Sequence, residues 1–247
     1  MPRGSPWCSC TASLTPGTRS RWCSLTCPRP SHAFAITQRG HGDASRPDEG
    51  YRSQDFAADL AAFMDEVDLE AAVLVSGSSG GFAARRLAID QPERVLGLVL
   101  LGSPATLQDK PVVRELWDST ISKLTDPVDP GFVRDFGAGT LAQSVPHAFF
   151  ETLVQENLKV PARVWKATYE GLLEDDSLKD LDKIRAPTVI IWGDQDSLLP
   201  RSDQEALASA IPGSRLLVYP GAGHSLYWEE PERVASDLAA FVEDLVK

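Results

Sequence analysis

The sequence predicts an α/β protein with a mostly parallel central sheet and helices on both of its faces. From residue 33 onwards, short apolar runs alternate with amphipathic runs, which is the pattern of parallel strands joined by helices. The predicted strands are 33–37, 71–75, 95–101, 187–192 and 215–219, and the predicted helices are 53–67, 82–90, 202–210 and 231–245. The alternation is interrupted between residues 106 and 186, where prolines are scattered and no strand is evident.

Each element follows from a local pattern. Helix 53–67 is predicted because Phe56, Leu60, Phe63 and Met64 recur at the spacing of one helical face, and such a stripe packs in a core. The runs 71–75 and 95–101 are short, continuous and apolar, as strands buried on both faces are. The same alternation resumes at residue 187 and closes with helix 231–245.

The interruption predicts a helical cap, residues 106–186, inserted between two parts of one α/β core, residues 33–105 and 187–247. Aromatic residues in helix-like runs more commonly pack in a core than contact a substrate, so no cap residue is assigned to a site. The aromatic residues concerned are Trp117, Phe149, Phe150 and Trp165.

A turn of small residues, Ser-Gly-Ser-Ser-Gly-Gly at 76–81, joins the predicted strand 71–75 to the predicted helix 82–90. Strand, tight turn and helix are the context of a nucleophile elbow, where a serine adopts a strained backbone conformation. Its neighbours two positions away must be small because the strand and the helix nearly touch there. The turn therefore predicts a nucleophilic serine.

Two later loops complete a catalytic pattern. Gly-Asp-Gln-Asp at 193–196 follows the predicted strand 187–192, and Gly-Ala-Gly-His at 221–224 follows the predicted strand 215–219. Serine, then acid, then histidine is the chain order of an α/β-hydrolase triad.

Residues 33–247 resemble an α/β-hydrolase-fold serine hydrolase. The landmarks of the resemblance are Arg39-Gly40-His41-Gly42, the turn at 76–81, Pro92-Glu93-Arg94-Val95, Trp192-Gly193-Asp194-Gln195-Asp196, Gly221-Ala222-Gly223-His224 and Trp228-Glu229-Glu230-Pro231. The resemblance implies a hydrolase without cofactor or metal that cleaves a small ester, lactone or related acyl compound. Serine at the elbow argues against dehalogenases and epoxide hydrolases, which use aspartate there. Carbon–carbon bond hydrolases and cofactor-free haloperoxidases stay open.

Two serines fit the nucleophile position. A strict Gly-x-Ser-x-Gly reading starts at Gly77 and selects Ser79. The commoner form in the family, Gly-His-Ser-x-Gly-Gly, aligns without gaps onto 76–81 and selects Ser78, with Ser76 in place of the usual first glycine. We favour Ser78, because Ser79 would need one extra residue between the strand and the turn. The backbone N–H of Ser79 would then form part of the oxyanion hole.

The resemblance also assigns the other roles. His224 is the expected general base, and Asp196 is the expected acid because the family places the acid fourth in Gly-x-x-Asp. Asp194 is the rival acid, although two aspartates two residues apart are commonly turn formers. We interpret His41 as a structural turn residue, and His147 has no supporting context.

Residues 1–32 differ from the rest in composition. They contain four arginines, no acidic residue and all four cysteines, Cys8, Cys10, Cys23 and Cys27. The cysteine spacings fit poorly with common zinc modules. A transit peptide would explain the Arg- and Ser-rich composition, but the segment runs directly into the middle of a domain.

We favour a frameshift as the origin of this segment. Trp7-Cys8 and Trp22-Cys23 each contain a valine codon in a neighbouring frame, and that frame permits Val-Val-Leu-Leu-His-Gly-Phe-Pro-Asp-Ser-Trp over about residues 6–17. This sequence resembles the third strand of the family and the loop that supplies the second oxyanion N–H. We therefore expect residues 1–32 to be disordered, the first two strands to have no counterpart and the third strand to be lost. The alternative function is then a non-catalytic product that keeps the pocket.

The composition limits the partners. A net charge of −11 and a pI near 4.8 argue against nucleic acid or an anionic membrane. No apolar run approaches the roughly 18 residues of a spanning helix. We expect a small-molecule substrate and a cytoplasmic location, and the sequence does not indicate an oligomeric state.

Overall fold

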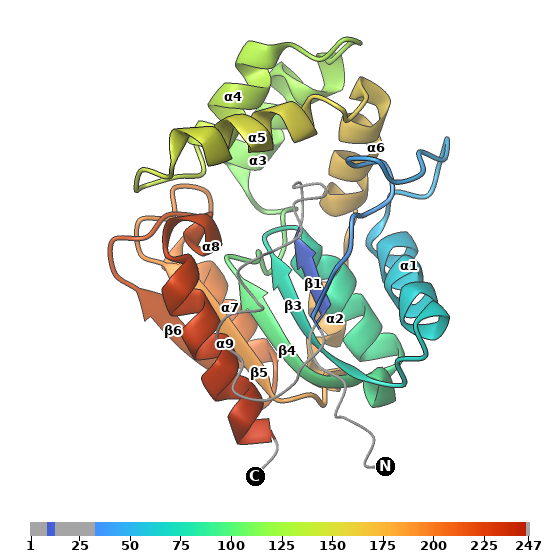
Figure 1. Ribbon diagram of the computed structural model, residues 1–247, viewed down its shortest axis with the longest axis vertical. Helices are drawn as coiled ribbons and strands as arrows, with labels where there is room; N and C mark the ends of the chain where they lie inside the picture. Colours follow the sequence, from blue (N-terminus) through green and yellow to red (C-terminus); the bar gives the residue numbers. More distant parts are fainter. Residues whose placement is uncertain (1–8, 13–32, 246–247) are drawn as a thin grey trace.

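A computed structural model describes residues 9–12 and 33–245 (Figure 1). It confirms the predicted fold class. The strands described form one parallel sheet in the order β2-β1-β3-β4-β5-β6. Their bounds are Ser9–Ala12 for β1, Phe34–Ala35 for β2, Ala72–Gly77 for β3, Val95–Leu101 for β4, Thr188–Gly193 for β5 and Arg215–Tyr219 for β6.

Helices cover both faces of the sheet, because side chains of successive strand residues point to opposite faces. Leu74, Leu98 and Ile190 pack in one apolar cluster with residues of α1, α2 and α7. Val75 and Ile191 pack on the other face with residues of α9. The helices of these layers are α1 Ser53–Glu66, α2 Gly80–Asp90, α7 Arg201–Ala210, α8 Leu226–Glu229 and α9 Pro231–Leu245, with the short 3₁₀ helix η1 at Pro92–Arg94.

Strand β1 lies at the position in the sheet where the third strand was predicted to be lost. Ser9–Ala12 pairs in parallel with β3 on one side and with β2 on the other, in mid-sheet. The prediction that this strand is missing is wrong for residues 9–12. Backbone N–H and C=O groups form the pairing, so a strand of unusual side chains can still fill the gap. The other residues of 1–32 lie outside the described part, and the frameshift stays a prediction that reading the DNA across codons 1–35 tests.

Helices alone occupy the segment between β4 and β5. They are α3 Pro111–Ser119, η2 Ile121–Lys123, α4 Pro130–Ala138, α5 His147–Asn157, α6 Ala162–Leu173 and η3 Ser177–Lys183. In Figure 1, α3 to α6 gather at one end of the sheet, and we call residues 106–186 the cap. Within the described residues, no helix is long and apolar enough to cross a membrane.

Candidate active site

The backbone at Ser78 is strained. This residue follows β3 directly and has a φ of 49°, in the left-handed region that residues with a side chain rarely adopt. Its N–H donates to Leu101 O at 2.8 Å, and its carbonyl accepts from Gly81 N at 3.0 Å. Ser79 has an ordinary helical φ of −59° and is the N-cap of α2. The elbow conformation therefore belongs to Ser78, the serine that we favoured.

The glycines around Ser78 leave room for close neighbours from other elements. A Cβ at Gly77 would lie 2.8 Å from the ring of Tyr227, and one at Gly81 would lie 2.7 Å from Ser103 Cβ. Ser76, in place of the usual first glycine, is buried and keeps regular β3 pairing with its neighbours.

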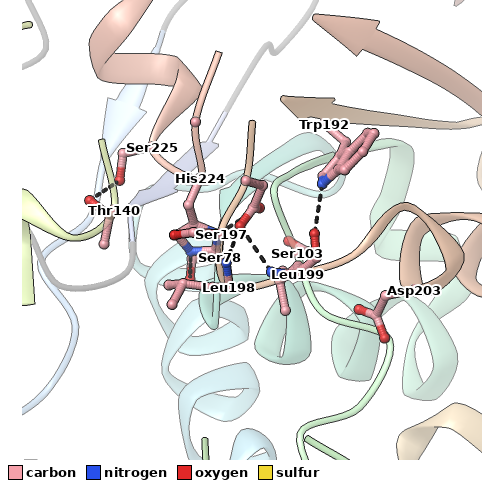
Figure 2. A network of polar contacts seen from close by, with 12 residues as sticks. Ser78, Ser103, Thr140, Trp192, Ser197, Leu198, Leu199, Asp203, His224 and Ser225 are labelled. Atoms are coloured by element: carbon pink, nitrogen blue, oxygen red, sulfur yellow. Dashed lines mark hydrogen bonds and ion pairs between the residues drawn. The ribbon is translucent and has the colours of Figure 1, made fainter. Parts of the chain in front are cut away.

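The three predicted catalytic side chains lie in one hydrogen-bonded chain, and Figure 2 labels two of them, Ser78 and His224. His224 Nε2 is 2.8 Å from Ser78 Oγ, and His224 Nδ1 is 2.9 Å from Asp196 Oδ2. A carboxylate only accepts hydrogen bonds, so Nδ1 carries the proton and the neutral ring presents the Nε2 lone pair to the serine hydroxyl. The other oxygen of Asp196 accepts the N–H groups of Leu198 and Leu199, each at 2.9 Å.

A mostly apolar pocket opens beside Ser78. It holds about 810 Å³ of empty space, including its open mouth. The core side of the pocket is lined by His41, Ser78, Ser79, Pro104, Leu198, Leu199 and His224, and the cap side by Leu107, Val112, Val113, Leu116, Phe136, Trp165, Thr168, Tyr169 and Leu172. None of these side chains is a carboxylate, a lysine or an arginine.

The family described as the alpha/beta hydrolase family matches residues 4–237. The chain belongs to this family. It is 29% identical to the non-heme chloroperoxidase of Burkholderia pyrrocinia, over 85% of this chain and 81% of that protein. It is also 28% identical to a 2-hydroxy-6-oxononadienedioate/2-hydroxy-6-oxononatrienedioate hydrolase of Paraburkholderia phymatum, over 78% of this chain and 69% of that protein.

An esterase from Exiguobacterium antarcticum has a similar structure, with a TM-score of 0.85 and 21% identity over 97% of this chain and 92% of that one. At this identity the likeness shows the fold alone. Family membership confirms the predicted enzyme class, a hydrolase of this superfamily.

Asp194, the rival acid of this hydrolase, lies in a turn, and its carboxylate bonds to groups other than His224. Its Oδ1 accepts the Gly221 N–H at 2.7 Å, which lowers the pKa of the carboxyl group, and the side-chain amide of Gln195 at 3.0 Å. These bonds join the loops that carry Asp196 and His224, as expected of a turn former.

The remaining histidines differ in environment. His41 is 3% exposed, its Nδ1–H donates to Arg39 O at 2.9 Å, and burial lowers its pKa. It is a turn residue as predicted, but it also lines the pocket, which the sequence analysis did not anticipate. His147 is exposed at the start of α5, near Glu151.

The cap forms much of the pocket wall, although no cap residue was predicted to belong to the site. Trp165, Thr168, Tyr169 and Leu172 are spaced as one face of α6. This spacing can be read from the sequence, but the spacing alone does not indicate which face of α6 lines the pocket.

One predicted oxyanion donor can be located. Ser79 lines the pocket at the N-terminus of α2, where backbone N–H groups and the helix dipole favour negative charge. The loop expected to supply the second donor lies outside the described residues. In residues 9–12 and 33–245 there is no group of three or more His, Cys, Asp or Glu side chains placed to hold a metal ion.

Proposed function

We propose that this protein is a serine hydrolase that cleaves a small, largely apolar ester or lactone through an acyl-enzyme on Ser78. The hydrogen-bonded chain from Ser78 through His224 to Asp196, beside an apolar pocket, carries the proposal. Membership of the alpha/beta hydrolase family supports it.

The geometry gives each group one task. Ser78 Oγ attacks the substrate carbonyl carbon while His224 Nε2 takes the hydroxyl proton, and Asp196 stabilises the imidazolium that forms. The tetrahedral oxyanion faces the Ser79 N–H. When the intermediate collapses, the C–O bond to the leaving group breaks and His224 returns the proton to the departing alcohol. In the second step His224 takes a proton from a water molecule, which attacks the carbonyl carbon of the acyl-enzyme. The bond to Ser78 Oγ then breaks, His224 returns the proton to Ser78, and the acid is released.

The pocket chemistry limits the acyl group. Its wall is apolar, so burying a hydrocarbon group of the substrate there stabilises the complex by about 25 cal/mol per Å² of buried apolar surface. A carboxylate in the substrate would find no arginine or lysine among the residues that line the pocket. We therefore favour uncharged acyl groups over diacids of the kind named for the relative from Paraburkholderia phymatum.

Covalent labelling tests the proposal. The full chain should react with a fluorophosphonate probe and hydrolyse p-nitrophenyl butyrate, and Ser78→Ala should abolish both activities. Ser79→Ala keeps the backbone N–H and should retain labelling. Labelling that survives Ser78→Ala but not Ser79→Ala would assign the nucleophile to Ser79. Binding of butyrate esters without turnover or labelling would favour the non-catalytic alternative.

A second candidate follows from the similarity to a chloroperoxidase. Hydrogen peroxide can replace water as the nucleophile that attacks the acyl-enzyme, which releases a peracid and restores the serine. Peracid formation from acetate ester and peroxide, lost in Ser78→Ala, would support this reaction. If the wild-type chain hydrolyses the ester and forms no peracid, this candidate is wrong.

A further inference from the structure

One loop of the cap is hydrogen-bonded to the loops that carry His224 and Asp196. We call residues 139–143 the cap loop. Thr140 O accepts the N–H of Ser225 at 3.0 Å, and Thr140 Oγ1 accepts the hydroxyl of Ser225 at 2.9 Å (Figure 2). The hydroxyl of Ser197 donates to Gly139 O at 3.3 Å. Ser225 and Ser197 follow His224 and Asp196 directly in the chain, so the cap loop is hydrogen-bonded to the residue after each member of the predicted base–acid pair.

The carboxylate of Glu229 joins the same two regions. Its Oε1 accepts the N–H groups of Ala142 and Gln143, at 2.6 and 3.1 Å, and its Oε2 accepts the N–H of Gly223 at 2.6 Å. One side chain thus satisfies three backbone donors, two in the cap loop and one in the residue before His224. Hydrogen bonds to a charged acceptor are roughly twice as strong as neutral ones.

Close packing makes these contacts sensitive to displacement. A Cβ on Gly223 would lie 2.6 Å from Ala142 N and 2.8 Å from Glu229 Oε1. The backbone before His224 therefore has little room to shift unless the cap loop and Glu229 shift with it.

We propose that Glu229 is a positioning residue that acts through Gly223 to hold His224 within hydrogen-bonding distance of Ser78, and that it couples this geometry to the cap. The inference rests on the proposed function. The His224 ring must keep two hydrogen bonds at once, one to Ser78 and one to Asp196. A displacement of about 1 Å in such a site lowers turnover about 10²-fold.

Glutamine at position 229 provides a near-isosteric test. The carboxylate is an acceptor at both oxygens, whereas an amide presents an NH₂ group on one side. In Glu229→Gln the NH₂ group must therefore face either the N–H of Gly223 or the two N–H groups of the cap loop, where donor would oppose donor. The neighbouring Glu230 is a matched control, because its carboxylate accepts from the side chains of Gln143 and Arg233, each at 3.1 Å, and not from backbone N–H groups of the described residues.

Steady-state kinetics on the full chain tests the role. We expect Glu229→Gln to lower kcat for p-nitrophenyl butyrate by about 10- to 100-fold with KM within about threefold of wild type. Its rate of fluorophosphonate labelling should fall by a similar factor, and Glu230→Gln should stay within about threefold of wild type in all three quantities. An unchanged kcat in folded Glu229→Gln, or a rise in KM alone, would overturn the proposal.

A spectroscopic readout separates this proposal from the proposed function. In ¹⁵N-histidine spectra, wild type and Glu230→Gln should show His224 as the Nδ1–H tautomer, and Glu229→Gln should show a mixture. This comparison needs no turnover, so a wild-type chain without esterase activity would contradict the proposed function and leave the positioning role to be decided by the spectra. An unaltered tautomer in Glu229→Gln would refute positioning.

If Glu229→Gln does not fold, Thr140→Val tests whether the cap loop is coupled to the position of His224. It removes the bonds that the Thr140 hydroxyl makes with Ser225 and with Gly137 O, and it leaves Glu229 in place. A fall in kcat of about 3- to 10-fold with KM unchanged would support the coupling, and wild-type kcat would oppose it.

Discussion

Replacing Asp196 by asparagine tests which nitrogen of His224 carries the proton. Asp196 Oδ1 accepts two backbone N–H groups, from Leu198 and Leu199, so the oxygen of an asparagine amide would take that side. The NH₂ group must then face His224 Nδ1, which can accept that bond only without its own proton. The proton moves to Nε2, the atom 2.8 Å from Ser78 Oγ, and the ring no longer presents a lone pair to the serine.

The expected effect is large. Forcing the wrong tautomer of the base in a Ser-His-Asp site lowers kcat about 10⁴-fold, which is about 5 kcal/mol of transition-state stabilisation. The assay is kcat for p-nitrophenyl butyrate at saturating ester, with the folded fraction checked by circular dichroism. KM should change little, because Asp196 does not line the pocket.

Asp194→Asn is the matched control, since it makes the same chemical change two residues away. Asp194 accepts from Gly221 and Gln195 in a turn, so we expect kcat within about threefold of wild type. The reasoning fails if Asp196→Asn keeps more than a tenth of wild-type kcat, or if Asp194→Asn loses as much as Asp196→Asn.

Three further predictions concern stability. Gly81→Ala should lower the free energy of unfolding by about 1–3 kcal/mol in urea titrations, because its Cβ would press on Ser103, whereas Gly137→Ala has 3.4 Å of clearance and should lose less than about 1 kcal/mol. His41 is buried and its pKa lies below the ordinary 6.5, so the stability that the neutral side chain contributes is fully present above pH 6.5 and is lost on acidification. The Tm of the wild type should therefore fall more between pH 7 and pH 5 than the Tm of His41→Gln. Thr168→Val removes a buried hydroxyl that has no partner in the described chain, and it should leave the protein as stable as before or up to about 1 kcal/mol more stable; a loss above about 1 kcal/mol would show that the hydroxyl is hydrogen-bonded in solution.

The position of the strained turn could be predicted from the sequence because its requirements are local. A strand, a tight turn and a helix within a few residues leave few positions for the serine, and the alignment without gaps chose Ser78, whose φ is 49°. The choice of Asp196 over Asp194 also agrees with the contacts of the two side chains. Both aspartates occupy one loop, and only position in the loop distinguishes them.

Other features depend on contacts between distant segments and could not be predicted in this way. Strand β1, Ser-Cys-Thr-Ala, is only four residues long and has no continuous apolar run, and its place between β2 and β3 comes from backbone pairing. Glu229 appeared only as part of a family landmark, because its three backbone donors lie in loops far apart in the sequence. The α6 face of the pocket required knowledge of how the cap sits on the core.

The link between Glu229, Gly223 and the cap loop has a consequence for the synthesis of the chain. The elbow serine and the cap loop are synthesised before the base, and the base and the carboxylate that joins its loop to the cap lie only five residues apart, at 224 and 229. A nascent chain that stops before residue 224 lacks both of them at once. Under the proposed mechanism, a partly made chain of this kind would hold its serine without a base, and the base would arrive together with the carboxylate that joins its loop to the cap.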